Sequence, residues 1–196
     1  MLTEANKMRI GICGTQSTGK STLVKALMED NAMFNSDLAE YKFFTERSKQ
    51  LQSEGAPLNK KSTFNGQIIF AAERAKELMN KNMITDRTSI DVAAFTEAAP
   101  NISVHEKTGL TFTLLELTKQ YDLIIYIPPV IPLINNGVRD IDEEYRKQID
   151  ELIQKLLKHP NVVDKLYCLK SVDLMDRIKE VKAVMKFGEA NKQCSL

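Results

Sequence analysis

Cysteine is scarce in this chain, and its spacing excludes two kinds of structural site. The 196 residues contain three cysteines, at positions 13, 168 and 194. An odd number at such wide spacing gives neither a disulfide framework nor the closely spaced pairs of a zinc site. Cys13 and Cys168 lie inside apolar runs, so we expect both to be buried, unreactive thiols. His105 and His159 lack partners at metal-ligand spacing, and we expect both at the surface.

Long hydrophobic runs and a charge excess are also missing. No stretch reaches the about 18 apolar residues of a membrane-spanning helix, and the N-terminus lacks the long apolar segment of a signal peptide. These absences predict a cytoplasmic protein with no membrane partner. Lys and Arg number 27 against 26 Asp and Glu, so the formal net charge is +1. That balance disfavours nucleic acid as a partner, although it leaves room for a local basic groove.

What the chain does have is enough apolar sequence for one folded domain. Hydrophobic residues make up 43% of the 196 residues, and a chain of this length needs no disulfide or metal to fold. Short apolar runs rich in β-branched residues alternate with segments in which apolar residues recur every three or four positions. The short runs cover residues 8–13, 41–45, 83–85, 123–127 and 162–169. This alternation predicts an α/β fold, with a five-stranded parallel sheet covered by helices on both faces.

The helical segments are marked by apolar stripes, and we expect each stripe to pack against the core. The first helix covers residues 21–28, directly after the first strand. The other stripes are Ile68, Ala72, Ala75 and Met79; Leu110, Leu114 and Leu117; Ile141, Tyr145, Ile149, Leu152 and Leu156; and Leu174, Ile178, Val181 and Met185.

The strongest motif is the segment GTQSTGKS at residues 14–21, which fits G-x-x-x-x-G-K-[ST]. It lies between an apolar strand and a helical run, which is the context that a phosphate-binding loop requires. Glycine lets the backbone turn tightly and aim N–H groups at phosphate oxygens, and the following helix adds its positive end. Lys20 is expected to reach the β- and γ-phosphates of ATP, and the Ser21 hydroxyl to bind Mg²⁺. The expected nucleotide-binding residues are Gly14, Thr15, Gln16, Ser17, Thr18, Gly19, Lys20, Ser21 and Thr22.

A second polar group follows the third predicted strand. Ligands of open α/β sheets bind beyond the carboxyl ends of the strands, so Asp86 is expected to face the same crevice as the phosphate loop. Its carboxylate suits Mg²⁺ or the proton of an attacking hydroxyl, while Arg87 and Asp91 are candidate substrate ligands. The alternative is structural: Asp86 caps a helix that starts near Ser89, and Arg87 is solvated.

Glu46 and Arg47 follow the second predicted strand at the same edge. Glu46 is a candidate base for an acceptor hydroxyl, and Arg47 is a candidate ligand of an acceptor phosphate. The alternative for both is the exposed start of a helix.

A third group follows the fourth predicted strand. Asn135, Asn136 and Gly137 indicate a turn, which places Arg139 at the start of a helix that continues to about Lys158. Arg139 and Arg146 are candidates for neutralising a transferring phosphoryl group from a mobile lid at about residues 130–150. A solvated helix face is the alternative for this charged segment. The fourth strand ends in Pro128 and not in the Asp-Glu pair of many mechanical ATPases, which weakens a motor interpretation.

The ordered set of motifs resembles a known family. The motifs that carry the resemblance are residues 14–21, 45–47, Gln67, 86–95, 121–129 and 136–139. Together they are similar to the AAA-domain P-loop proteins of phages and bacteria, and to the ribosylnicotinamide kinase domain of bifunctional NAD-biosynthesis regulators. More distantly they resemble thymidylate and deoxynucleoside kinases. The chain departs from many relatives by carrying Asn136 before Gly137, and we expect no separate nucleotidyltransferase domain in residues 1–196.

The resemblance implies a kinase-type sheet with an arginine-bearing lid, spanning residues 1–196 as one domain. By position, Glu46 and Asp86 would serve the acceptor and the metal, and Arg139 the phosphates. The expected function is ATP- and Mg²⁺-dependent phosphorylation of a small nucleoside or nucleoside monophosphate. Two alternatives stay open: an ATPase or ATP-binding regulator, and a kinase of nucleic-acid ends or modified bases.

Overall fold

A five-stranded parallel sheet forms the centre of the molecule. The computed structural model describes residues 7–34, 41–45, 53, 55, 57–132 and 142–187. The strands are β1 (Arg9–Cys13), β2 (Lys42–Phe44), β3 (Met83–Asp86), β4 (Leu123–Tyr126) and β5 (Leu166–Cys168). They are ordered β2-β3-β1-β4-β5, and each neighbouring pair is parallel. The predicted α/β class and parallel sheet are therefore confirmed.

Helices connect the strands, mostly where the apolar stripes predict them. They are α1 (Lys20–Phe34), α3 (Phe64–Leu78), α4 (Ser89–Ala98), α5 (Val104–Leu117), α6 (Glu143–Leu157), α7 (Pro160–Val163) and α8 (Leu174–Phe187), with 3₁₀ turns η2 (Asn59–Lys61) and η3 (Thr118–Gln120). The predicted strand at 162–169 is partly wrong. Pro160 stands at the first position of α7 and the His159 side chain caps that helix, so the pairing strand begins only at Leu166.

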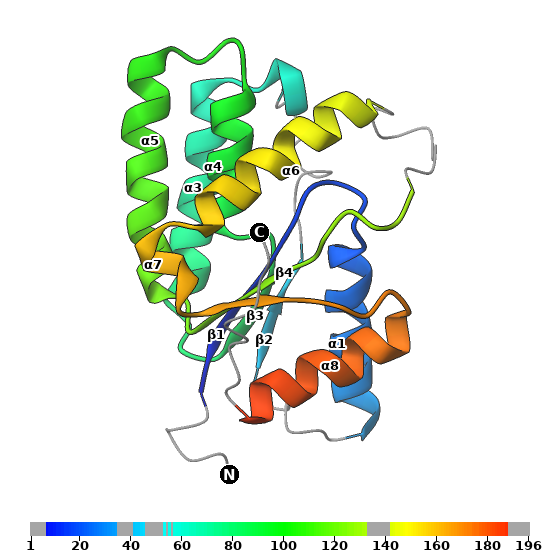
Figure 1. The fold of residues 1–196 in the computed structure, drawn as a ribbon. Helices are drawn as coiled ribbons and strands as arrows, with labels where there is room; N and C mark the ends of the chain where they lie inside the picture. The colour runs from blue at the N-terminus through cyan, green and yellow to red at the C-terminus, as the bar shows by residue number, and fades with distance from the viewer. Residues whose placement is uncertain are drawn as a thin grey trace.

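The two faces of the sheet are covered by different helices (Figure 1). Helices α1 and α8 pack on one face, and α4 and α6 lie on the other, with α3 and α5 further out. Alternate strand residues supply the two cores because successive side chains of a strand point to opposite faces. On β1, Ile10 and Ile12 join the core under α1 and α8, whereas Cys13 joins the core under α4 and α6.

Helix α3 turns a different face inward from the one that its apolar stripe predicts. Ile68 is 42% exposed and Met79 is 82% exposed, so the predicted core stripe faces outward. The buried face carries Gln67, Arg74 and Glu77 beside Phe70. Arg74 and Glu77 are stable in the interior because they bond the end of β3, as described below.

The scarce cysteines do not behave alike. Cys13 is free and fully buried, as expected, and burial raises the pKa of its thiol well above the ordinary value. Cys168 is disulfide-bonded, so the expectation of a free thiol there is wrong. His105 is exposed, as expected, and His159 is half-buried because it caps α7. Among the described residues, none of the helices combines the length and the apolar character that crossing a membrane requires.

Candidate functional site

The phosphate loop lies between the end of β1 at Cys13 and the start of α1 at Lys20. Its glycines are required by geometry: Gly19 has a φ of +89°, and a Cβ on Gly14 would lie 2.6 Å from the Ile127 carbonyl oxygen. The Lys20 ammonium bends back into the loop, where Nζ donates to the carbonyl oxygens of Gly14 at 2.5 Å and Thr15 at 2.8 Å. The cation is therefore held at the centre of the loop, where the motif places a phosphate.

Three helices from distant parts of the chain hold this loop in place. Asp91 on α4 accepts a hydrogen bond from the Gly14 N–H at 3.1 Å. The Arg146 carbonyl on α6 accepts one from the Thr15 hydroxyl at 3.2 Å. Arg177 on α8 donates to the Thr18 carbonyl at 2.8 Å. The loop shape is thus fixed by tertiary contacts as well as by its own glycines.

Asp91 uses both carboxylate oxygens inside the protein. Its Oδ1 bonds Gly14 as above, and its Oδ2 accepts from the Thr88 N–H at 2.7 Å and the Thr88 hydroxyl at 2.8 Å. The bonds between Oδ2 and Thr88 belong to a capping box at the start of α4. The Asp91 side chain is fully buried. This placement differs from the expectation that Asp91 faces a substrate: the residue ties the start of α4 to the phosphate loop. The spacing Thr88-x-x-Asp91 is the pattern of a capping box, so the sequence carries a signal for this structural role.

Asp86 and Arg87 lie next to the phosphate loop at the carboxyl edge of the sheet. Asp86 pairs in register with Ile12 near the end of β1, and its side chain is fully buried. It does not cap the following helix, because Thr88 does so. Arg87 has a φ of +87°, which is strained for a residue with a side chain. Its guanidinium lies over the rings of Phe95 and Phe70, at 5.0 and 5.8 Å from their centroids.

A buried polar network on α3 supports this strained turn. Arg74 is 2% exposed, and its Nη1 donates to the carbonyl oxygens of Asp86 at 3.1 Å and Arg87 at 2.7 Å. Its Nη2 pairs with Glu77 at 2.6 Å, and Glu77 also accepts from the Thr85 hydroxyl at 2.7 Å. Burial raises the pKa of Glu77, while the Arg74 charge opposes that shift. Arg74 is not among the sequence-predicted site residues, although it lies seven residues, about two helical turns, after Gln67.

Arg146 lies beside the phosphate loop, but its guanidinium contacts Ile131 after β4 and Glu143 on α6. It is 2% exposed, with Nη2 donating to the Ile131 carbonyl at 2.7 Å and Nη1 3.4 Å from Glu143. The helix that carries it begins at Glu143 with Asp142 as its cap, later in the chain than predicted. Its position at the site follows from the contact of its carbonyl with Thr15.

Some predicted site residues cannot be placed. Glu46, Arg47 and Arg139 lie outside the described residues, as do residues 133–141 of the lid predicted at about 130–150. The segment before α3 reaches α6 nearby: Lys60 forms an ion pair with Asp142 and lies over the Tyr145 ring at 5.3 Å. This hydrogen-bonded ion pair lowers the pKa of Asp142.

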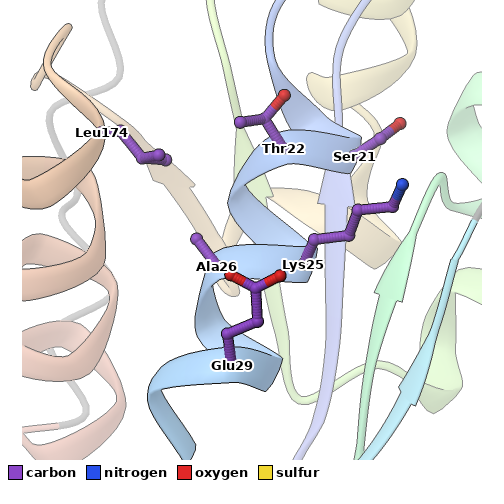
Figure 2. Close-up of a pocket in the computed structure, with 6 residues that line it drawn as sticks. All are labelled: Ser21, Thr22, Lys25, Ala26, Glu29 and Leu174. Atoms are coloured by element: carbon purple, nitrogen blue, oxygen red, sulfur yellow. The ribbon is translucent and has the colours of Figure 1, made fainter.

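A groove of about 280 Å³ runs along α1 beside the phosphate loop. It is lined by Ser21, Thr22, Lys25, Ala26, Glu29 and Leu174. Figure 2 shows Ser21 and Thr22 at the N-terminal end of α1, Glu29 further along the same helix, and Leu174 facing them from the start of α8. The groove therefore begins where the phosphate loop ends.

The oxygen donors at this edge suit a magnesium ion. Within the part of the chain that the structure describes, no group of three or more His, Cys, Asp or Glu residues is placed to hold a metal by itself. Mg²⁺ does not need such a group, because it commonly keeps several waters and binds one or two carboxylates together with substrate phosphates. Ser21 at the start of α1 and Asp86 at the end of β3 supply a hydroxyl and a carboxylate of that type.

The sequence profile of an AAA-domain family matches residues 9–169. The chain belongs to this AAA-domain family. The match begins with β1 and ends just beyond β5, so it includes the whole sheet, the phosphate loop and the Asp86–Arg87 turn. A search of curated proteins finds no match.

Solved structures share the fold at low sequence identity. The family member described here superposes on the NadR protein in complex with NR with a TM-score of 0.67 and 18% identity, covering 93% of this chain and 53% of that one. It therefore spans about half the length of NadR. For deoxyadenosine kinase from M. mycoides the TM-score is 0.56 and the identity 20%, with 91% and 98% of the two chains covered. For thymidylate kinase from Ehrlichia chaffeensis the values are 0.58, 15%, 91% and 98%. These likenesses establish a P-loop kinase-type fold.

Proposed function

We propose that the chain is an ATP-dependent kinase of a nucleoside or nucleoside monophosphate. The observation that carries the proposal is a formed phosphate loop around Lys20, with Asp86 and Arg87 on the neighbouring strand end. The shared fold with kinases of small nucleosides and nucleotides supports the same reaction class. In this proposal the loop amides and Lys20 hold the ATP phosphates, and the groove along α1 takes part of the nucleoside.

The reaction would be an in-line phosphoryl transfer. An acceptor oxygen, either a nucleoside hydroxyl or a monophosphate oxygen, forms a bond to the γ-phosphorus, the bond from that phosphorus to the β,γ-bridging oxygen breaks, and ADP leaves. When the acceptor is a hydroxyl, a carboxylate, either Asp86 or Glu46, accepts its proton. Mg²⁺ bound by Ser21 and Asp86 would neutralise charge on the β- and γ-phosphates. Lys20 supplies a fixed positive charge there.

The arginines are assigned by position. The Arg87 guanidinium lies over the rings of Phe70 and Phe95 beyond the end of β3, and in this proposal it binds an acceptor oxygen. Arg146, whose backbone carbonyl contacts Thr15 in the loop, would exchange its bond to the Ile131 carbonyl for a phosphoryl oxygen. Arg47 and Arg139 complete the proposed acceptor and lid ligands, and Glu46 and Asp86 remain the two candidate bases. Closure has a chemical purpose, because an open site would transfer the phosphoryl group to water.

The decisive experiment is an assay of ADP formation with Mg²⁺, ATP and a panel of nucleosides and nucleoside monophosphates. We expect ADP to appear only with a suitable acceptor, together with an equal amount of phosphorylated product. Lys20→Ala should abolish that activity, because it removes the charge at the centre of the loop. Lys119→Ala is the control, since Lys119 is an exposed lysine whose ammonium pairs with Glu116. Acceptor-independent ADP would indicate an ATPase or regulator, and labelled phosphate on an oligonucleotide would indicate a nucleic-acid kinase.

A further inference from the structure

Arg177 connects the last helix of the described chain to the phosphate loop. It lies on α8 and is 3% exposed. Its Nη1 donates to the Thr18 carbonyl at 2.8 Å, and its Nε donates to the Ser171 carbonyl at 3.0 Å. The guanidinium thus bridges the loop after β1 and the segment after β5.

The bond to Thr18 fixes the direction of a neighbouring amide. The Thr18 carbonyl and the Gly19 N–H belong to one planar trans peptide unit, so they point in opposite directions. Because Arg177 holds the carbonyl on the α8 side, the Gly19 N–H is directed away from α8. Gly19 lies in the left-handed region with a φ of +89°, and a Cβ there would be only 2.8 Å from Arg177 Nη1. The guanidinium therefore packs against the glycine that the motif requires.

Arg177 is itself held firmly by the segment that follows β5. Glu180, on the same helix, accepts from the Lys170 N–H at 2.9 Å, the Ser171 N–H at 2.8 Å and the Tyr167 hydroxyl at 2.7 Å. The Ser171 carbonyl that Arg177 contacts is thus on a segment with two fixed amides. This rigidity lets a side chain from α8 set the orientation of a backbone unit in the phosphate loop.

We propose that Arg177 is a positioning residue for phosphate binding. It acts through the Thr18–Gly19 peptide, keeping the Gly19 N–H aimed at the phosphate groups that the loop receives. The inference rests on the proposed function, because it concerns the nucleotide that the kinase would use. Arg177 does not need to contact the nucleotide in this role, so its effect is on the geometry of the donors.

The test compares ligand affinities of Arg177→Met with those of the wild-type chain by calorimetry. The probes are ATP, inorganic tripolyphosphate and adenosine, each titrated into the full chain. Loss of one oriented hydrogen bond to a charged group predicts ATP binding weaker by about 10- to 100-fold. Tripolyphosphate should weaken by the same factor, whereas adenosine affinity should not change. A general structural defect would weaken all three ligands together.

Two further variants keep the result interpretable. Lys179→Met removes one positive charge from the exposed side of α8, where Lys179 pairs with Asp176, and it should leave all affinities unchanged. Arg177→Lys keeps the charge but cannot span Thr18 and Ser171 with one fork, so we expect about a 10-fold loss for ATP. If the methionine variant does not fold, the lysine variant decides.

Several outcomes overturn the proposal. The first is an ATP affinity in Arg177→Met equal to that of the wild-type chain. The second applies if Arg177→Met does not fold, and it is a wild-type ATP affinity in Arg177→Lys. The third is a loss of ATP affinity in Lys179→Met as large as that in Arg177→Met. A wild-type chain that binds neither ATP nor tripolyphosphate refutes the proposed function itself. That result is distinct, because it appears before any variant is compared.

Discussion

Replacing Asp91 with asparagine tests whether this carboxylate holds the phosphate loop or binds a substrate. Asp91 accepts three hydrogen bonds, at 3.1 Å from the Gly14 N–H, 2.7 Å from the Thr88 N–H and 2.8 Å from the Thr88 hydroxyl. Asparagine has nearly the same shape but only one acceptor oxygen. If that oxygen stays toward Thr88, the amide NH₂ faces the Gly14 N–H, and two donors oppose each other.

The size of the effect follows from these contacts. A buried donor left without an acceptor costs about 1–3 kcal/mol, and the bonds at Thr88 weaken further when their acceptor loses its charge. Together these terms predict that Asp91→Asn lowers the free energy of unfolding by about 2–4 kcal/mol. For a domain of this size that corresponds to a fall in Tm of roughly 4–16 °C.

Scanning calorimetry with and without ATP measures the change in stability, and steady-state kinetics measures the acceptor KM. We expect a lower Tm, weaker ATP binding and an unchanged acceptor KM. Glu106→Gln is a matched control, because Glu106 forms the corresponding capping box with Ser103 at the start of α5 without contacting the loop. It should leave ATP binding unchanged. A wild-type Tm with a raised acceptor KM in Asp91→Asn would refute this reasoning and favour a substrate ligand.

Two further substitutions probe the strand ends. Arg74→Met should raise the pKa of buried Glu77 further. Glu77 then keeps its proton in the folded variant at pH values where the unfolded chain, with a Glu pKa of about 4.3, has lost it. The stability lost by this variant should therefore be larger at pH 8 than at pH 5 in urea unfolding, and equal losses would contradict the pairing. Gly11→Ala places a Cβ 2.4 Å from Thr88 Cγ2 and 2.9 Å from Tyr121 Cε1, so it should lower the free energy of unfolding by roughly 1–3 kcal/mol. An unchanged thermal unfolding curve would show that the side chains of Thr88 and Tyr121 can move aside without a loss of stability.

The sequence predicts the sheet and the phosphate loop well because both depend on local patterns. Strand β3 is a short apolar run ending in Asp86, and the loop motif fixes glycines at positions where the backbone requires them. Sequence reasoning fails for α3, where the apolar stripe containing Ile68 and Met79 faces outward. The inward face is polar because Arg74 bonds the turn after β3, a requirement that only the folded structure reveals.

The supports of the site are harder to predict than its motif. The contact between Arg177 and Thr18 joins residues 159 positions apart, and no pattern near either residue indicates it. Asp91 is an intermediate case: its spacing from Thr88 signals a helix cap, but its bond to Gly14 depends on how α4 packs beside β1. The position of a polar residue just after a predicted strand indicates that it lies near the site. Its role depends on the residues that the fold brings into contact with it.

The three supports of the phosphate loop also bear on the order of folding. They join residues separated by 77, 131 and 159 positions along the chain, so the loop has all three supports only when α8 docks. We expect contacts of such long range to form late, because closing a long stretch of chain costs entropy before the contacts offset it. The motif at residues 14–21 lies near the start of this chain but acquires its full set of supports only when α8 docks. Nucleotide binding would then report that the fold from β1 to α8 has formed.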